Sequence, residues 1–483
     1  MYQRIARVYP IVVLSLVAAA PGSAQDAMPR LDLEPCEIEG VTGAECGTLT
    51  VYEDRDAGSG RTLDLYVVVV PATHPDPEPD PVYVLTGGPG SAATRAAASA
   101  GRSPLHVRRA YVFMDQRGTG RSNGLYCLVD DDEPVDAFLG EIFDEDRIAR
   151  CREKLAEQAD LTLYTTPLAM DDLDDLRQAL GHEQINLWGT SYGTRASLVY
   201  LRRHEEHVRS AVLNASMSLG QVMPMEMAAD AETAVRNVLA DCEASEACAS
   251  RFPDLEEDYR LAVEGASGPV QVTLTDPRTE REVQGTMQPA GFGEALRAMM
   301  YDPGATRDIP RFLHLAAREG NYDGFAQFGA ARAMAISRIA AGGLYLSVTC
   351  AEDIPFANEP GEYEAAQGTF LTDSRSRSHF DACRVWPRGT VSEDFHDDVV
   401  SDVPVLILNG EHDPVTPPRW GAEAAEHLSR SGHVVVPHGG HGWGGLENSG
   451  CVARIQMAFI ENPASDALDL SCLSEIRRRA FRQ

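Results

Sequence analysis

The stretch 184–193 reads Gln-Ile-Asn-Leu-Trp-Gly-Thr-Ser-Tyr-Gly and joins an apolar run to the pentapeptide Gly-Thr-Ser-Tyr-Gly. It predicts a buried strand, a sharp turn at Ser191 and then a helix over 194–204, where apolar residues recur at helical spacing. Such a turn needs Gly189 and Gly193, because a Cβ atom at either position would collide with backbone. Alone, the pentapeptide also suits a flexible turn, but its strand and helix context favours Ser191 as a nucleophile.

Outward from this turn, short apolar runs alternate with amphipathic segments. Helices are expected over 146–158 and from Thr165 or Thr166 to Gly181, where the second has proline in its first turn. This alternation predicts a mostly parallel sheet with helices on both faces, that is, an α/β fold. The expected strands are Gly47–Tyr52, Thr62–Val70, Val82–Leu85, Ala110–Asp115, Gln184–Gly189 and Val208–Leu213.

The pattern changes between about 216 and 390, where Ala- and Met-rich helical stretches surround a polar, strand-like piece at 270–284. The expected helical stretches are 223–240, 294–301, 309–317 and 322–342. Strand patterns return at 403–409 and 433–437. We therefore expect a core formed by 25–215 and 391–483, interrupted by a mainly helical cap insertion over 216–390. Two independent domains are the alternative, which is weaker because the core needs its last strands from beyond the insertion.

A loop after the late strand 405–409 carries the acid that a nucleophilic serine needs. In an α/β-hydrolase fold the order along the chain is serine, acid, histidine. Asp413 lies in Gly-Glu-His-Asp-Pro-Val-Thr-Pro, just past the end of that strand, where such sheets place functional groups. Glu411 is the nearby competitor, and the strand end together with the chain order favours Asp413.

The histidine is expected in the loop 437–443, Pro-His-Gly-Gly-His-Gly-Trp. Glycines on both sides of His441 leave room for the backbone to bring an imidazole over Ser191, so His441 is favoured over His438. His427 and His433 lie in a predicted helix and at a strand start, which indicates structural roles. Ser191, Asp413 and His441 are thus the expected catalytic residues.

Glycines also end the early strand 82–85, in the sequence Leu85-Thr86-Gly87-Gly88-Pro89-Gly90. Negative charge that develops on a carbonyl oxygen needs backbone N–H donors, which glycines allow to approach closely. We assign one donor to the amide of Gly88 and the other to that of Tyr192, with a simple turn as the alternative. The segment 115–122 lacks the lysine of a phosphate loop, and we expect its Asp and Arg to brace the surrounding loops.

Taken together, these motifs resemble the proline iminopeptidase family of α/β-hydrolases, and in particular its secreted bacterial tripeptidyl aminopeptidases. The resemblance covers most of the chain and extends to 348–356, Val-Thr-Cys-Ala-Glu-Asp-Ile-Pro-Phe, and to 403–472. It implies a serine aminopeptidase that releases residues from the free N-terminus of a peptide. Glu352 and Asp353, in the matching segment, are then candidates to bind the substrate's α-ammonium group, with an ordinary acidic loop as the alternative.

Two other functions remain open on the sequence. The same three side chains could serve an esterase or lipase, since related secreted hydrolases include esterase-like members. A binding protein on a hydrolase scaffold that has lost its activity is the second alternative, which the presence of all three catalytic residue types disfavours.

The N-terminus predicts export. Arg4 and Arg7 precede an apolar stretch over 11–20 and the small residues Gly22-Ser23-Ala24, which is typical of a signal peptide cleaved after residue 24. Ten cysteines then favour disulfides, and neighbours along the chain suggest five pairs. These are Cys36–Cys46, Cys127–Cys151, Cys242–Cys248, Cys350–Cys383 and Cys451–Cys472.

Composition narrows the range of partners. The formal net charge of −31 would repel phosphate backbones, so nucleic acid is not an expected partner. No other apolar stretch is long enough to suggest a membrane span. No cofactor is expected, and no Cys or Cys/His cluster has metal-ligand spacing, so zinc is disfavoured. The expected partners are peptides with a free N-terminus, and the oligomeric state is left open.

Overall fold

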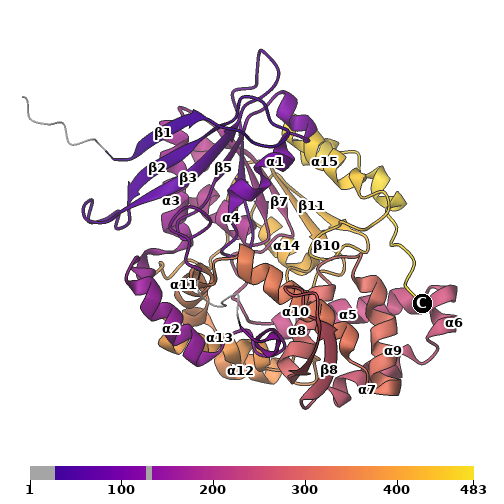
Figure 1. Ribbon diagram of the computed structural model, residues 1–483. Coiled ribbons are helices and arrows are strands. Elements are labelled where there is room, and N and C mark those ends of the chain that lie inside the picture. Colours follow the sequence, from indigo (N-terminus) through magenta and orange to yellow (C-terminus); the bar gives the residue numbers. More distant parts are fainter. Residues whose placement is uncertain (1–27, 127–132) are drawn as a thin grey trace, which may run out of the picture.

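A twisted sheet of nine strands forms the centre of the molecule (Figure 1). The computed structural model describes residues 28–126 and 133–483, so the expected signal peptide lies outside the described residues. The strands lie in the order β1-β2-β3-β5-β4-β6-β7-β10-β11. Their bounds are β1 Arg30–Pro35, β2 Glu45–Tyr52, β3 Thr62–Val70, β4 Val82–Leu85, β5 Tyr111–Met114, β6 Ile185–Thr190, β7 Val208–Asn214, β10 Val405–Gly410 and β11 Ser431–Val436.

The sheet is antiparallel at one end and parallel over the rest. Strands β1, β2, β3 and β5 pair antiparallel in that order, whereas β5, β4, β6, β7, β10 and β11 run parallel to one another. The parallel strands β4, β5 and β10 are short and buried on both faces, as their apolar sequences predicted. Their carboxyl ends therefore meet at one edge of the sheet, where the loops after β4, β6, β10 and β11 come together.

Helices cover both faces of this sheet. Helices α3 and α4 contribute to the apolar core on one face, and α1 and α15 to the core on the other. The mostly parallel sheet with helices on both faces confirms the predicted fold class. The bounds of the helices outside the segment between β7 and β10 are α1 Ala97–Ala100, α2 Glu145–Ala156, α3 Thr166–Ala179, α4 Tyr192–Arg203, α14 Pro418–Ala425 and α15 Gly450–Glu461.

Between β7 and β10 the chain forms helices and one hairpin, which gather beyond one end of the sheet (Figure 1). Much of this segment packs around a second apolar core of its own, built from α5, α7, α8, α9 and α10 together with the hairpin. We call this segment the cap. Its elements are α5 Met227–Glu243, α6 Glu246–Arg251, α7 Leu255–Gly265, β8 Val270–Thr275, β9 Glu282–Met287, α8 Pro289–Met299, α9 Ile309–Glu319, α10 Asp323–Ile339, α11 Gly342–Glu352, α12 Glu359–Ala365 and α13 Ser374–Val385.

Two elements differ from the sequence prediction. No strand was expected before Gly47, but β1 pairs with β2 along the edge of the sheet, with side chains that are mostly exposed. The helix expected over 322–342 ends at Ile339, because Ala340 has extended backbone and pairs with Ser91 before α11 begins. This break brings the cap against the glycine-rich loop after β4.

Four of the five predicted disulfides are present among the described residues. They join Cys36 to Cys46, Cys242 to Cys248, Cys350 to Cys383 and Cys451 to Cys472. The fifth predicted pair, Cys127–Cys151, has one member outside the described residues. Over residues 28–126 and 133–483, none of the helices has both the length and the apolar character needed to cross a bilayer.

Candidate active site

The turn between β6 and α4 holds Ser191 in a backbone conformation that side-chain-bearing residues rarely adopt. Its φ is 57° and its ψ is −127°. The glycines on either side are required by space. A Cβ atom at Gly189 would lie 2.6 Å from the carbonyl oxygen of Gly193, and one at Gly193 would lie 2.1 Å from that of Leu85. The turn therefore fits against the end of β4, and the serine hydroxyl lies above the carboxyl edge of the sheet.

Ser191, His441 and Asp413 form one continuous hydrogen-bonded chain. The Nε2 atom of His441 lies 2.8 Å from Oγ of Ser191. The Nδ1 atom of the same ring lies 3.0 Å from Oδ1 and 2.9 Å from Oδ2 of Asp413. Three loops that are far apart in the sequence supply these side chains, because β6, β10 and β11 all end at the same edge of the sheet. The arrangement can remove the serine proton and stabilise the resulting imidazolium.

Asp413 is held as a carboxylate. It is 1% exposed and accepts hydrogen bonds from the amides of Val415 and Thr416 and from the Thr416 hydroxyl. Burial alone would raise its pKa, but the charge of His441 and these hydrogen bonds outweigh burial and lower the pKa below its ordinary value. The carboxylate therefore remains charged and orients the imidazole.

The two competitors considered for these roles point elsewhere. Oε2 of Glu411 accepts the backbone N–H of His438, at 2.8 Å. The ring of His438 instead contacts Asp241 of α5, with Nδ1 2.9 Å from Oδ2. Neither side chain takes part in the hydrogen-bonded chain that contains Ser191.

The cap covers the histidine of this site. The ring of Tyr301 lies edge-on to that of His441, with 4.8 Å between the ring centroids. A backbone hydrogen bond makes a second contact between the cap and the histidine loop, because the amide of Gly442 donates to the Tyr301 carbonyl at 3.1 Å. A Cβ atom at Gly440 would lie 2.2 Å from the Met300 carbonyl oxygen, so the glycines around His441 allow both the loop's path and its contact with the cap.

The loop after β4 lies directly beside the nucleophile. A Cβ atom at Gly87 would come within 2.9 Å of the Ser191 Cβ, and Gly88 is exposed with a φ of +125°. Tyr192 is the first residue of α4, so its amide has no carbonyl partner within the helix. These positions suit the expected roles of the Gly88 and Tyr192 amides as donors to an oxyanion, which stay predictions.

Glu352 and Asp353 do not line the site. Their exposed fractions are 0% and 1%. Glu352 accepts hydrogen bonds from the amide and the hydroxyl of Thr166, while Asp353 pairs with Arg195 at 2.9 Å and accepts the amide of Met223. In this conformation neither carboxylate can reach a bound peptide, so the expected binding of an ammonium group is not supported. Family likeness identified the segment, but burial could not be inferred from it.

Burial instead favours the protonated form of the Glu352 carboxyl group, which lies beneath the nucleophile. It raises the pKa of Glu352 to about 7, against the opposing effects of Arg195 and the Thr166 hydrogen bonds. The Thr166 hydroxyl also lies 2.7 Å from the hydroxyl of Tyr192, the residue that follows Ser191. This buried network therefore supports the turn rather than the substrate.

The segment 115–122 has the bracing role that was expected from its sequence. The Asp115 carboxylate accepts the amides of Thr94 and Arg121, at 2.9 and 3.1 Å. Arg117 is fully buried and forms two hydrogen bonds with Asp172 of α3, at 2.7 and 2.9 Å. These contacts fix the loops beside the glycine-rich segment.

Cap side chains near the site could not be placed from the sequence. Arg297 donates to the Tyr301 hydroxyl at 2.8 Å, and Glu294 lies between Arg297 and Arg375 with one-fifth of its side chain exposed. The two guanidinium groups lower the pKa of Glu294 to about 2, although burial opposes this.

Next to these charged side chains lies an apolar cluster that packs against Tyr301 and Tyr345. It consists of Met217, Met223, Met227 and Val415. The methionine-rich composition was visible in the sequence, but its position was not.

Comparisons with known proteins agree with the fold described above. The family model described as "alpha/beta hydrolase fold" matches residues 80–266, and the one described as "TAP-like protein" matches 369–472. The serine protease Hip1 of Mycobacterium tuberculosis is 24% identical over 475 residues, which covers 87% of this chain and 88% of Hip1. A tripeptidyl aminopeptidase of Streptomyces lividans is 30% identical over 216 residues, covering 41% of this chain and 40% of that protein.

Proposed function

Because this chain is a serine hydrolase of the α/β-hydrolase family with a TAP-like C-terminal part, we propose that it is an aminopeptidase that acts on peptides with a free N-terminus. The observation that carries the proposal is the chain of contacts from Ser191 through His441 to Asp413. The names of its relatives, a serine protease and a tripeptidyl aminopeptidase, favour a peptide bond as the target.

The reaction proposed for this geometry is acyl transfer. The Ser191 hydroxyl gives its proton to Nε2 of His441 as its oxygen attacks the scissile carbonyl carbon. The amides of Gly88 and Tyr192 stabilise the negative oxygen of the tetrahedral intermediate, and Asp413 stabilises the imidazolium. His441 then protonates the leaving amine, and a water molecule, deprotonated by the same histidine, releases the acyl group.

The cap supports cleavage near a chain end rather than within a long chain. It contacts the loop that carries Gly88 through the Ala341 amide to the Gly90 carbonyl, and it contacts His441 through Tyr301. A folded polypeptide would have to pass beneath these contacts, whereas a short free end needs only one opening.

The proposal is tested with a panel of peptide amides that differ only at the N-terminus, free or acetylated, alongside chromogenic esters of the same residues. We expect free peptides to be cleaved with a higher kcat/KM than acetylated ones, and mass spectrometry of the products gives the number of residues released. Equal cleavage of acetylated peptides, or turnover of esters alone, would support the esterase alternative instead.

The nucleophile has its own test. Ser191→Ala removes the attacking oxygen but keeps the turn, so we expect turnover to fall by about 10⁶-fold while the thermal midpoint stays close to that of the parent. Labelling by a fluorophosphonate should be lost in parallel. A chain that fails to react with the fluorophosphonate before substitution would favour the non-catalytic binding protein.

We also propose that the protein is exported by cleavage after residue 24. The support is the N-terminal pattern of charged, apolar and small residues together with the disulfides, which persist in oxidising compartments. The N-terminal residue of the mature protein, read from the culture medium or periplasm, tests this assignment.

A further inference from the structure

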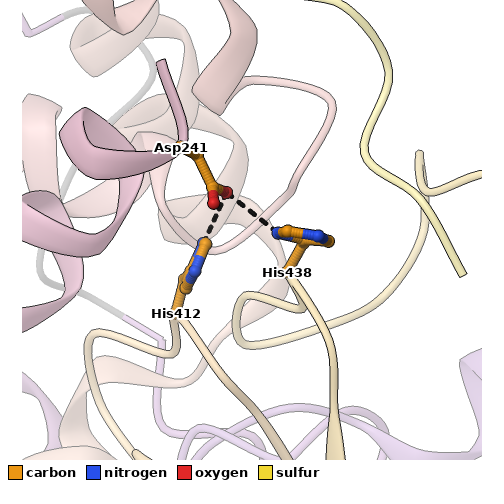
Figure 2. Close-up of side chains that lie close together, drawn as sticks. All are labelled: Asp241, His412 and His438. Atoms are coloured by element: carbon orange, nitrogen blue, oxygen red, sulfur yellow. Dashed lines mark hydrogen bonds and ion pairs between the residues drawn. The ribbon is translucent and has the colours of Figure 1, made fainter. Parts of the chain in front are cut away.

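Behind the catalytic loops, three side chains that the proposed reaction does not use converge on one point. They are Asp241 at the end of α5, His412 in the loop after β10 and His438 in the loop after β11, shown in Figure 2. One potential ligand atom from each lies within 4.8 Å of the other two. Because the three are far apart in the sequence, no metal-binding spacing could reveal them.

The distances within this cluster suit a small metal ion. Oδ2 of Asp241 lies 2.9 Å from Nδ1 of His438 and 3.6 Å from Nδ1 of His412. Ligands of a tetrahedral zinc ion, at the usual bond lengths, lie about 3.3 Å apart, which falls between the two values. Both nitrogen–oxygen distances thus lie within a few tenths of an ångström of the zinc value, and two imidazoles with one carboxylate form a ligand set that zinc commonly has.

The cluster is also built on fixed backbone. The amide of His412 donates to the Gly439 carbonyl at 2.7 Å, so the two histidine loops are tied to each other. Asp241 precedes Cys242, whose disulfide to Cys248 holds the end of α5. A site whose ligands are already held close to binding geometry loses little conformational entropy when the ion binds.

A cation already occupies one side of this cluster. Nη1 of Arg478, from the C-terminal segment, lies 2.7 Å from Oδ2 of Asp241. The site therefore attracts positive charge, and the guanidinium competes for the same carboxylate. Its Nε is buried without a hydrogen-bond partner among residues 28–126 and 133–483, so the hydrogen-bonding capacity of this arginine is only partly used.

We propose that Asp241, His412 and His438 bind a divalent transition-metal ion, with Zn²⁺ the best match, and that the ion clamps the cap to the catalytic loops. The clamp follows from connectivity. His412 directly precedes Asp413, His438 lies three residues before His441, and Asp241 belongs to the cap. Zinc would bridge α5 to both loops at once. It lies outside the reacting atoms, so its effect is on stability.

Calorimetric titration of the EDTA-treated full chain with ZnCl₂ tests the proposal. We expect one ion per chain and a thermal midpoint that rises with zinc, because the ion binds only the folded state. His412→Ala, His438→Ala and Asp241→Asn should each weaken binding by about 10- to 100-fold or more. Co²⁺ in place of zinc should give visible absorption bands typical of four ligands, which these variants lose.

Matched variants separate this site from other histidines. His427 also pairs with a carboxylate, Asp398 at 3.1 Å, but His427→Ala should leave zinc binding unchanged, because no third potential ligand joins that pair among the described residues. His441→Ala should likewise keep the isotherm, which distinguishes the proposed site from zinc held by the catalytic pair. Arg478→Ala should tighten binding, since it removes the competing cation.

Three results would overturn the proposal. They are the absence of a zinc isotherm with the parent chain, an unchanged isotherm in Asp241→Asn, and loss of binding in His441→Ala alone. Asp241→Asn is the decisive variant, because it is nearly isosteric and lies outside the catalytic loops. Thermal melting without zinc checks that each variant is folded before it is titrated.

Discussion

At the scale of single residues, the catalytic side chains were identifiable from the sequence because each one lies in a loop whose backbone demands glycine or ends a buried strand. The glycines flanking Ser191 are required by contacts shorter than 3 Å, and they form a motif that can be recognised without coordinates. Glu352 shows the limit of this reasoning. Its segment was recognised, but whether a carboxylate faces a cavity or a buried threonine depends on packing that no local pattern encodes.

The acid of the catalytic chain gives a prediction at this scale. Asp413→Asn keeps the shape of the side chain but presents an N–H to a ring nitrogen that is already a donor, so it favours the wrong tautomer of His441. We expect kcat to fall by about 10³- to 10⁴-fold with KM nearly unchanged. Stopped-time assays on a free-N-terminal peptide measure this. Glu411→Gln is the matched control, because its carboxylate contacts the His438 amide and the His412 ring rather than His441. Comparable losses in both variants would contradict the assignment.

The buried carboxyl of Glu352 predicts a pH dependence of stability. Its pKa is about 7 in the folded protein, above the ordinary value of 4.5. Between these values the folded state holds a proton that the unfolded state has lost, so the free energy of unfolding falls as pH rises and levels off above about 7. Glu352→Gln has no such carboxyl and so avoids this loss. Relative to the parent, its free energy of unfolding should therefore rise by about 2–3 kcal/mol between pH 4.5 and pH 8.

Urea unfolding of the parent and of Glu352→Gln at several pH values measures the difference. Glu362, whose pKa burial also raises to about 7, contributes equally to both proteins and cancels in the comparison. The exposed Glu157→Gln is the control and should leave the parent's pH dependence intact. A pH dependence unchanged in Glu352→Gln would show that this carboxyl is ionised in the folded state.

At the scale of elements, the buried parallel strands were predicted within one or two residues because their apolar runs are short and bounded by turn residues. The edge strand β1 escaped prediction because its exposed side chains carry no apolar alternation over more than a few positions. The break between α10 and α11 escaped as well. Residues around Ala340 have good helix propensity, and only the tertiary pairing with Ser91 holds that residue extended.

The junction of β6 and α4 gives a prediction at this scale. Gly193→Ala places a methyl group 2.1 Å from the carbonyl oxygen at the end of β4, so α4 must move away from the strand. We expect activity to fall by at least about 100-fold and stability by about 1–3 kcal/mol, as for other overpacked sites. Gly450→Ala is the matched control near a helix start, since its nearest contact is a flexible arginine end at 3.8 Å. The control should be neutral or slightly stabilising.

At the scale of the whole molecule, the two-part organisation was visible as a change of pattern, but the contacts that join the parts were not. Tyr301 against His441, and the cluster of Asp241 with His412 and His438, each combine a cap residue with a residue from the C-terminal loops. Such contacts depend on how the apolar core of the cap and the core around the sheet pack against each other. Sequence patterns describe each core but carry no information on the docking.

The overall charge gives a prediction at this scale. A formal net charge of −31 means that acidic residues far outnumber basic ones, so repulsion among carboxylates opposes the compact state. Salt screens this repulsion, with a Debye length that falls from about 30 Å at 0.01 M to about 10 Å at 0.1 M. We expect the thermal midpoint to rise between 10 and 300 mM NaCl, measured by scanning calorimetry. A midpoint that falls with salt would mean that attractive ion pairs dominate the surface.

The pairing of Ser91 with Ala340 has a mechanical consequence. The extended joint between α10 and α11 is bound to the loop that carries Gly88, the proposed oxyanion donor, through this bridge and through the hydrogen bond from the Ala341 amide to the Gly90 carbonyl. A movement of the cap away from the sheet at this contact would displace the loop that carries Gly88. The cap cannot move away at this contact while the proposed oxyanion donor stays in place. We therefore expect peptides to enter and leave at another part of the boundary between the cap and the core.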